Sequence, residues 1–244
     1  MDGLILSENQ YERVLEGVIV TTQLLGAAFV LGVVLSLIFG VARLSDRRWV
    51  RGASLVYVEF ARGISTIVLL FIMAYAIPIL LGLPQREVFV LATIALGVNM
   101  GGYGAEIIRG AILSVPNGQS EASIALNLTN TQRLRYIVLP QAMRVILPPM
   151  GNLTIEILKG TALVSLVGLS DLTFEIDKLN TNRILADNPV ATPALFFNAL
   201  VIYFILAQII NGLFRLGERY VERKYEGGEA TPLTDQHSGA GVTG

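Results

Sequence analysis

The chain of 244 residues contains no cysteine and one histidine, His237. Without cysteine, a disulfide framework, a thiolate nucleophile and a cysteine-ligated metal site are all excluded. A single histidine cannot form a metal cluster alone, and the scattered carboxylates form neither a paired acid–base site nor part of a Ser/His/Asp arrangement. We therefore expect no catalytic residues and no metal site in this chain.

Charged residues are scarce too: they make up 15% of the chain, against 53% hydrophobic residues. Four long stretches contain no Asp, Glu, Lys or Arg, and a fifth apolar segment is interrupted only by Glu156 and Lys159. Each is long enough, or nearly so, to cross about 30 Å of hydrocarbon as a helix, the form that satisfies backbone groups in lipid. The predicted spans are Val18–Ala42, Ser65–Leu83, Val88–Ile108, Val145–Ser170 (its helix ending near Lys159) and Pro193–Leu216.

The predicted fold is an all-α membrane protein, a transmembrane bundle of five helices. We expect one transmembrane domain over residues 1–224 and a disordered tail over 225–244, which is rich in Gly, Ser and Thr. Thirteen of the eighteen basic residues flank alternate connections between the spans. By the positive-inside rule, this distribution predicts an outside N-terminus and a cytoplasmic C-terminus.

A polar loop of about 114–141 joins the third and fourth spans, on the side predicted to be cytoplasmic. Ser120 is a plausible N-cap for a short helix that begins with Glu121. Ile124 and Leu128 are four residues apart and could present an apolar stripe to a partner's groove. Asn127 tolerates the left-handed conformation that a turn would need there. The loop is either a docking surface for a soluble partner or an amphipathic interfacial helix.

Charges within the spans are costly and usually functional. Glu156 and Lys159 are three residues apart and could pair on one helix face, or they could face a translocation path and meet a zwitterion. Lys159 could instead reach the outer interface. Asn99 and Tyr103 lie in a glycine-rich stretch of the third span, where the alternatives are close helix packing and a cavity-lining role.

The loop also carries a resemblance to a known family. The segment from Glu121-Ala-Ser to Asn127, followed by Ile137-Val-Leu-Pro140, resembles the "EAA" loop of bacterial ABC-importer permeases. Tyr57-Val-Glu-Phe-Ala-Arg-Gly63 resembles the signature of polar amino acid permeases. Segments around Asn99, Pro148 and Lys159 are similar to their third and fourth spans. The chain thus resembles a transmembrane subunit of the histidine/glutamine/arginine type of ABC importer.

This resemblance implies a type I importer permease of the bacterial inner membrane. Its partners would be ABC ATPase subunits, a second permease (identical or homologous), an extracytoplasmic solute-binding protein and membrane lipid, with no nucleic acid. The chain has no Gly-x-x-x-x-Gly-Lys-Ser/Thr motif, so no cofactor is expected in it and ATP would be bound by the partner. The residues expected to couple to the ATPase are Gly118, Glu121, Ala122, Ser123, Asn127, Ile137 and Pro140. Those expected along the substrate path are Asn99, Tyr103, Glu156 and Lys159.

The expected substrate is a polar amino acid or a related small zwitterion. Two departures from the family pattern, Ile64-Ser-Thr-Ile and Gly160, lie near membrane depth. They keep a compatible solute of the ectoine type, or an opine, open as alternatives. A secondary transporter and a membrane scaffold are alternative functions. A secondary transporter should show internal repeats and charged relays at the midplane, and neither is evident in the sequence.

Overall fold

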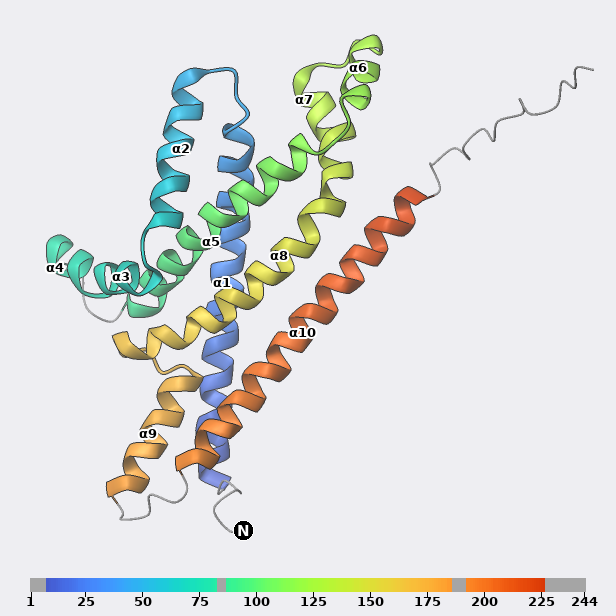
Figure 1. Ribbon diagram of the computed structural model, residues 1–244. Coiled ribbons are helices and arrows are strands. Elements are labelled where there is room, and N and C mark those ends of the chain that lie inside the picture. The colour runs from blue at the N-terminus through green and yellow to red at the C-terminus, as the bar shows by residue number, and fades with distance from the viewer. Residues whose placement is uncertain (1–7, 83–86, 186–191, 227–244) are drawn as a thin grey trace, which may run out of the picture.

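The computed structural model describes residues 8–82, 87–185 and 192–226, and the regular structure in these ranges is helical. The longest helices are α1 (Glu8–Ala42), α5 (Val88–Leu113), α8 (Leu139–Thr161) and α10 (Thr192–Glu226) (Figure 1). The shorter helices are α2 (Arg48–Gly63), α3 (Thr66–Phe71), α4 (Ile77–Leu81), α6 (Asn117–Ala125), α7 (Asn130–Arg133) and α9 (Leu172–Leu185).

Four helical segments of the described chain are long and apolar enough to cross a membrane: those of α1, α5, α10, and the continuous run Asn130–Val167 that contains α8. A fifth span results if α2 and the following helix Thr66–Leu81 are counted together, and these two meet at a bend of 101°. The predicted helical bundle is therefore confirmed. The second predicted span, Ser65–Leu83, differs: its helix Thr66–Leu81 passes as a span only together with the amphipathic α2, from which it turns sharply away.

The helices extend beyond the apolar spans predicted from the sequence. Helix α1 begins at Glu8, ten residues before its predicted span, and α10 continues to Glu226, ten residues beyond the end of its predicted span. Charged residues are disfavoured in lipid, but they are compatible with a helix. The stretches without charged residues are therefore shorter than the helices that contain them. Of the predicted tail, residues 227–244 lie outside the described residues.

Two π-helical turns accommodate prolines. The turn Ile72–Ala76 precedes Pro78, and the turn Leu134–Val138 precedes Pro140. A proline ring clashes with the carbonyl four residues earlier, and the wider π turn contains that carbonyl in both cases. The helix therefore passes through Pro140 and continues as α8.

Helix α5 lies at the centre of the bundle and packs along α1. Its membrane segment is 61% buried, whereas that of α10 is 6% buried. Close approach depends on small residues: a Cβ on Gly102 would lie 2.6 Å from the Cβ of Ala61 on α2. A side chain at Gly97 would similarly meet Leu31 of α1. Gly97 and Gly102 therefore serve close helix packing.

At the opposite end from α6, helix α9 packs against α1 and α10 (Figure 1). Asp171 caps α9: its carboxylate accepts hydrogen bonds from the backbone N–H of Thr173 (3.2 Å) and of Phe174 (2.9 Å). The Tyr203 hydroxyl of α10 also donates to this carboxylate, and Thr21 of α1 accepts from the N–H of Leu172. The connection between the fourth and fifth predicted spans thus contains a helix whose start is buried.

Candidate coupling surface and substrate path

Helix α6 forms the tip of the predicted coupling loop. Its N-cap position is occupied by Pro116, which offers no side-chain acceptor, so the sequence-based assignment of Ser120 as N-cap was wrong. Ser120 lies inside the helix, where its carbonyl accepts a hydrogen bond from the Ser123 hydroxyl at 2.6 Å. Pro116 is compatible with this start because the first N–H groups of a helix have no intrahelical partner.

The C-terminal end of α6 is a Schellman turn centred on Asn127. The N–H of Leu128 donates to the Ser123 carbonyl (3.1 Å), and the N–H of Asn127 donates to the Ile124 carbonyl (2.8 Å). Asn127 has φ = 57°, the one positive φ of a non-glycine residue in the described chain. The predicted left-handed conformation is therefore confirmed, and the turn fixes where α6 stops.

The outward surface of α6 combines one acid with small and apolar side chains. Gly118, Glu121 and Ala122 are exposed, while Ser123 is buried. Ile124 is 60% exposed and Leu126 is 73% exposed. Leu128 is half-buried and lies beyond the end of the helix. The predicted stripe of Ile124 and Leu128 was therefore wrong, and the exposed apolar pair is Ile124 with Leu126.

A cavity of about 490 Å³ separates α6 from the start of α8. Ile137 and Pro140 line it, together with residues of α8 and of the α5–α6 connection. Across this region the Gln141 amide donates to the Gln119 side-chain carbonyl at 3.3 Å, linking α8 to α6. All seven residues expected to couple to the ATPase thus lie on or beside α6 and the turn that enters α8.

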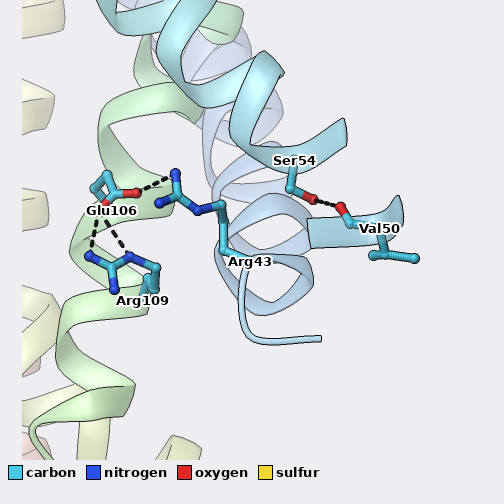
Figure 2. A network of polar contacts seen from close by, with 5 residues as sticks. All are labelled: Arg43, Val50, Ser54, Glu106 and Arg109. Carbon is cyan, nitrogen blue, oxygen red and sulfur yellow. Dashed lines mark hydrogen bonds and ion pairs between the residues drawn. The ribbon is translucent and has the colours of Figure 1, made fainter. Parts of the chain in front are cut away.

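Next to this region, an ionic cluster joins α1 to α5. Figure 2 shows Glu106 between two guanidinium groups: Arg109 at 2.9 Å and Arg43 at 2.9 Å. Glu106 and Arg109 are three residues apart on α5, a spacing at which side chains of one helix can pair. Arg43 follows the end of α1, and no local sequence pattern indicates its contact with Glu106. On α2, the Ser54 hydroxyl donates to the Val50 carbonyl of its own helix (Figure 2).

Asn99 and Tyr103 lie one turn apart on α5 and contact the end of α2. The Asn99 amide is buried and donates to the Ala61 carbonyl at 3.1 Å. The Tyr103 hydroxyl donates to the Arg62 carbonyl at 3.3 Å, and the Arg62 guanidinium lies 5.5 Å from the centre of the Tyr103 ring. The last carbonyls of a helix have no intrahelical donor, so these two side chains satisfy α2 at its bend.

Glu156 and Lys159 lie on α8 and both are exposed. In the described part of the chain no ion pair joins them, although their spacing permits one. Val145, Pro148 and Asn152 are exposed as well, and these five positions follow one another at intervals of three or four residues. They therefore form a single stripe along α8, called here the α8 stripe.

Comparison with known proteins identifies the fold and the family. Residues 32–223 match the family described as "Binding-protein-dependent transport system inner membrane component". The crystal structure of an amino acid ABC transporter with histidines has a chain that is 30% identical, with a TM-score of 0.75, over 86% of this chain and 94% of that one.

Relatives of known name support the same assignment. The probable amino-acid ABC transporter permease protein y4tF of Sinorhizobium fredii is 39% identical over 85% of this chain and 86% of its own. The L-cystine transport system permease protein TcyB of Bacillus subtilis is 35% identical over the same shares. Together with the apolar helices described above, these matches show that the chain belongs to the inner-membrane permease components of binding-protein-dependent ABC transport systems, as a multi-pass membrane protein.

Proposed function

We propose that this chain forms, with a second permease subunit, the translocation path for a polar amino acid or a related small zwitterion. The second permease is identical or homologous. ABC ATPase subunits dock on α6 at the cytoplasmic side, and a solute-binding protein delivers the substrate at the end that carries α9. This arrangement agrees with the family to which the chain belongs and with the separation of α6 and α9 at opposite ends of the molecule (Figure 1).

The shape of α6 carries the coupling role. Its apolar tip, Ile124 and Leu126, is exposed, and a short helix with an exposed apolar pair can enter a groove on a partner. The turn at Asn127 fixes the end of α6, and the contact between Gln119 and Gln141 links it to α8. Force applied to α6 is thereby transmitted to a membrane-spanning helix. Closure of the ATPase subunits on ATP would swing α8 and switch the path between its inward- and outward-facing states.

The α8 stripe is the proposed substrate path. Unpaired Glu156 and Lys159 are costly against hydrocarbon, so this face is expected to contact water or another subunit. A path between two permeases meets both conditions. In it, the Lys159 ammonium would attract the substrate carboxylate, and the Glu156 carboxylate would attract its ammonium group. Asn99 and Tyr103 would act from behind this surface by holding the bend of α2.

The substrate class follows from this chemistry and from the relatives. An α-amino acid carries one ammonium and one carboxylate group, which complements an acid and a base one helical turn apart. The relatives named above are permeases for amino acids and for L-cystine. An opine or a compatible solute of the ectoine type carries similar charges, and the external binding protein would select among such solutes.

Charge reversal at Glu121 tests the coupling role. Glu121 is exposed and has no ion-pair partner in the described chain, so Glu121→Lys should leave folding unchanged. We expect loss of the ATPase subunit from the copurified complex and at least tenfold slower uptake into membrane vesicles. Asp46→Lys, an equivalent change on an exposed acid in the connection between α1 and α2, is the control. Normal uptake by Glu121→Lys would count against the proposal.

A separate variant tests the path. Glu156→Gln removes the proposed contact with the substrate ammonium and leaves α6 intact. Uptake should fall while the ATPase still copurifies, which distinguishes a defect in the path from a defect in coupling. Uptake that persists without any ATPase and follows an ion gradient would favour a secondary transporter instead.

A further inference from the structure

An apolar cavity of about 280 Å³ lies between α1, α8 and α10, away from both α6 and the α8 stripe. Two hydroxyl groups occur among its lining residues, and both are already bonded within their own helices. Thr22 donates to the Val18 carbonyl (2.8 Å) and Thr154 donates to the Met150 carbonyl (2.7 Å). The cavity therefore presents an apolar wall and suits a hydrocarbon ligand.

The cavity opens on the outer surface of the bundle. Gly26 of α1 lines it and is exposed, and on the facing helix Ile209 is 54% exposed and Leu213 is 63% exposed. All three walls belong to segments that are long and apolar enough to span a membrane, so this opening lies at the depth of the lipid chains. A methylene group has about the volume of a water molecule, which is about 30 Å³. The cavity therefore has room for roughly nine methylene groups. A stretch of one acyl chain would fill it.

One edge of α10 leads from the cavity to a group of arginines. Beyond Ile209 and Leu213 it continues through Leu216 and Tyr220 to Arg223, at alternating intervals of three and four residues, all exposed. Leu213 and Arg223 are ten residues apart, or about 15 Å along the helix, which is half the thickness of a hydrocarbon core. Arg223 is therefore at the depth of lipid phosphates when the cavity is inside the same leaflet.

The charges around Arg223 favour an anionic headgroup. Arg219 is one turn before Arg223 and is also exposed, and neither makes an ion pair with any side chain that the structure describes. Glu222 is three residues after Arg219 on the same helix, but no ion pair joins these two side chains, and Glu218 is half-buried. Tyr220, 70% exposed, lies where aromatic side chains meet the membrane surface. Two exposed cations beside an interfacial aromatic residue complement a phosphate.

From these observations we propose that the cavity binds one acyl chain of an anionic phospholipid, whose phosphate contacts Arg219 and Arg223. The lipid fills the space between α1 and α10, which move apart toward the C-terminal end of α10 (Figure 1). A second copy of the chain at this surface would fill the groove with side chains, but it would not supply a phosphate to the two arginines. The lipid thus supports α10, the least buried of the long helices, against α1 and α8.

Filling the cavity tests the acyl-chain site. A Cβ on Gly26 would meet no atom within 4 Å, so Gly26→Leu can be accommodated and would occupy the groove. The protein, with any subunits that copurify, is titrated with palmitoyl-oleoyl phosphatidylglycerol and measured by native mass spectrometry. We expect Gly26→Leu to bind this lipid about tenfold more weakly, because the leucine would displace roughly two methylene groups of the acyl chain from the cavity. Gly212→Leu is the matched control, because Gly212 is also free of neighbours and lies outside the cavity.

Removing the cations tests the headgroup contact. Arg219→Gln and Arg223→Gln should each weaken phosphatidylglycerol binding roughly fivefold, the effect of one basic residue near an anionic surface. Binding of phosphatidylcholine with the same chains should weaken less, because its choline group already balances the charge of the phosphate. Both residues are exposed at the end of α10, so these variants should fold. Undiminished phosphatidylglycerol binding by either set of variants would overturn the proposal. The proposal would also be overturned if Gly212→Leu lost as much phosphatidylglycerol binding as Gly26→Leu. A changed number of permease copies in the Gly26→Leu complex would likewise overturn it.

Discussion

The Glu106 carboxylate of α5 lies 2.9 Å from the guanidinium of Arg43, which follows the last residue of α1. The same carboxylate also contacts Arg109, so one acid holds two cations. Its side chain is 21% exposed and that of Arg43 is 16% exposed, so water screens the cluster only partly. The pair therefore fixes the end of α1 to α5 close to the coupling surface.

Replacing this acid should destabilise the protein. Glu106→Gln leaves two partly buried guanidinium groups without a counter-charge, at a cost of about 2 kcal/mol, below the 3–5 kcal/mol seen for fully buried pairs. We expect a melting temperature lower by roughly 4–8 °C in detergent. Glu59→Gln serves as the control, because Glu59 is exposed and makes no ion pair in the described chain. Equal melting of the two variants would show that the cluster contributes nothing.

Much of the fold could be predicted from the sequence because the lipid imposes a simple rule. Long stretches without charge had to be helices, and the positions of α1, α5 and α10 follow. The bend after α2 could not be predicted, since Gly63 and Ser65 occur in many connections. Its position depends on Asn99 and Tyr103 of α5, which donate hydrogen bonds to the last carbonyls of α2. These donors are some forty residues away in the sequence. Such contacts leave no local pattern.

At the candidate coupling surface, too, some features follow from the local sequence and others do not. The left-handed turn at Asn127 was predictable because it depends on the intrinsic preference of one residue type. The assignment of Ser120 as N-cap used an equally local rule and was wrong, because Pro116 can begin a helix without a side-chain cap. The exposure of Leu126 depended on where α6 ends, and a shift of one or two residues changes which apolar side chains face outward.

Helix packing against α2 should be sensitive to one methyl group. A Cβ on Gly102 would lie 2.6 Å from that of Ala61, so Gly102→Ala should cost about 1–3 kcal/mol by separating α5 from α2. Gly110 lies on the same helix, and a Cβ there would meet nothing within 4 Å. Gly110→Ala should therefore stabilise by roughly 0.5–1 kcal/mol through helix propensity. Melting temperatures that move in the same direction would contradict the close contact.

The left-handed turn predicts an unusual order of substitutions at Asn127. With φ = 57°, Asn127→Gly should be tolerated, whereas Asn127→Ala should cost about 1 kcal/mol, because alanine keeps the Cβ that crowds the carbonyl oxygen but loses the short polar side chain that lets asparagine adopt this conformation. If the turn fixes α6 for coupling, uptake should fall in the alanine variant and be retained in the glycine variant. Uptake by both variants, measured at equal amounts of inserted protein, checks this order. A greater loss of uptake in Asn127→Gly than in Asn127→Ala would contradict the role of the turn.

Asp171 predicts a dependence of stability on pH at the α9 end. Burial raises the pKa of the Asp171 carboxyl above its ordinary value of 3.8, and the hydrogen bonds from Phe174, Thr173 and Tyr203 only partly oppose this. The folded state therefore holds this proton more tightly than the unfolded chain does. Its contribution to stability is fully present below pH 3.8 and is lost as the pH rises through the higher, folded value.

Comparison with Asp171→Asn isolates this effect, because the amide cannot ionise and its carbonyl can still cap α9. Other titrating groups are common to both proteins and cancel in the difference between their melting temperatures. The wild-type protein should lose stability relative to the variant as the pH is raised from about 4 toward neutrality. A difference that stays constant over this range, or that changes in favour of the wild type, would mean that the hydrogen bonds outweigh burial at Asp171. The carboxylate would then be the stable form at the start of α9.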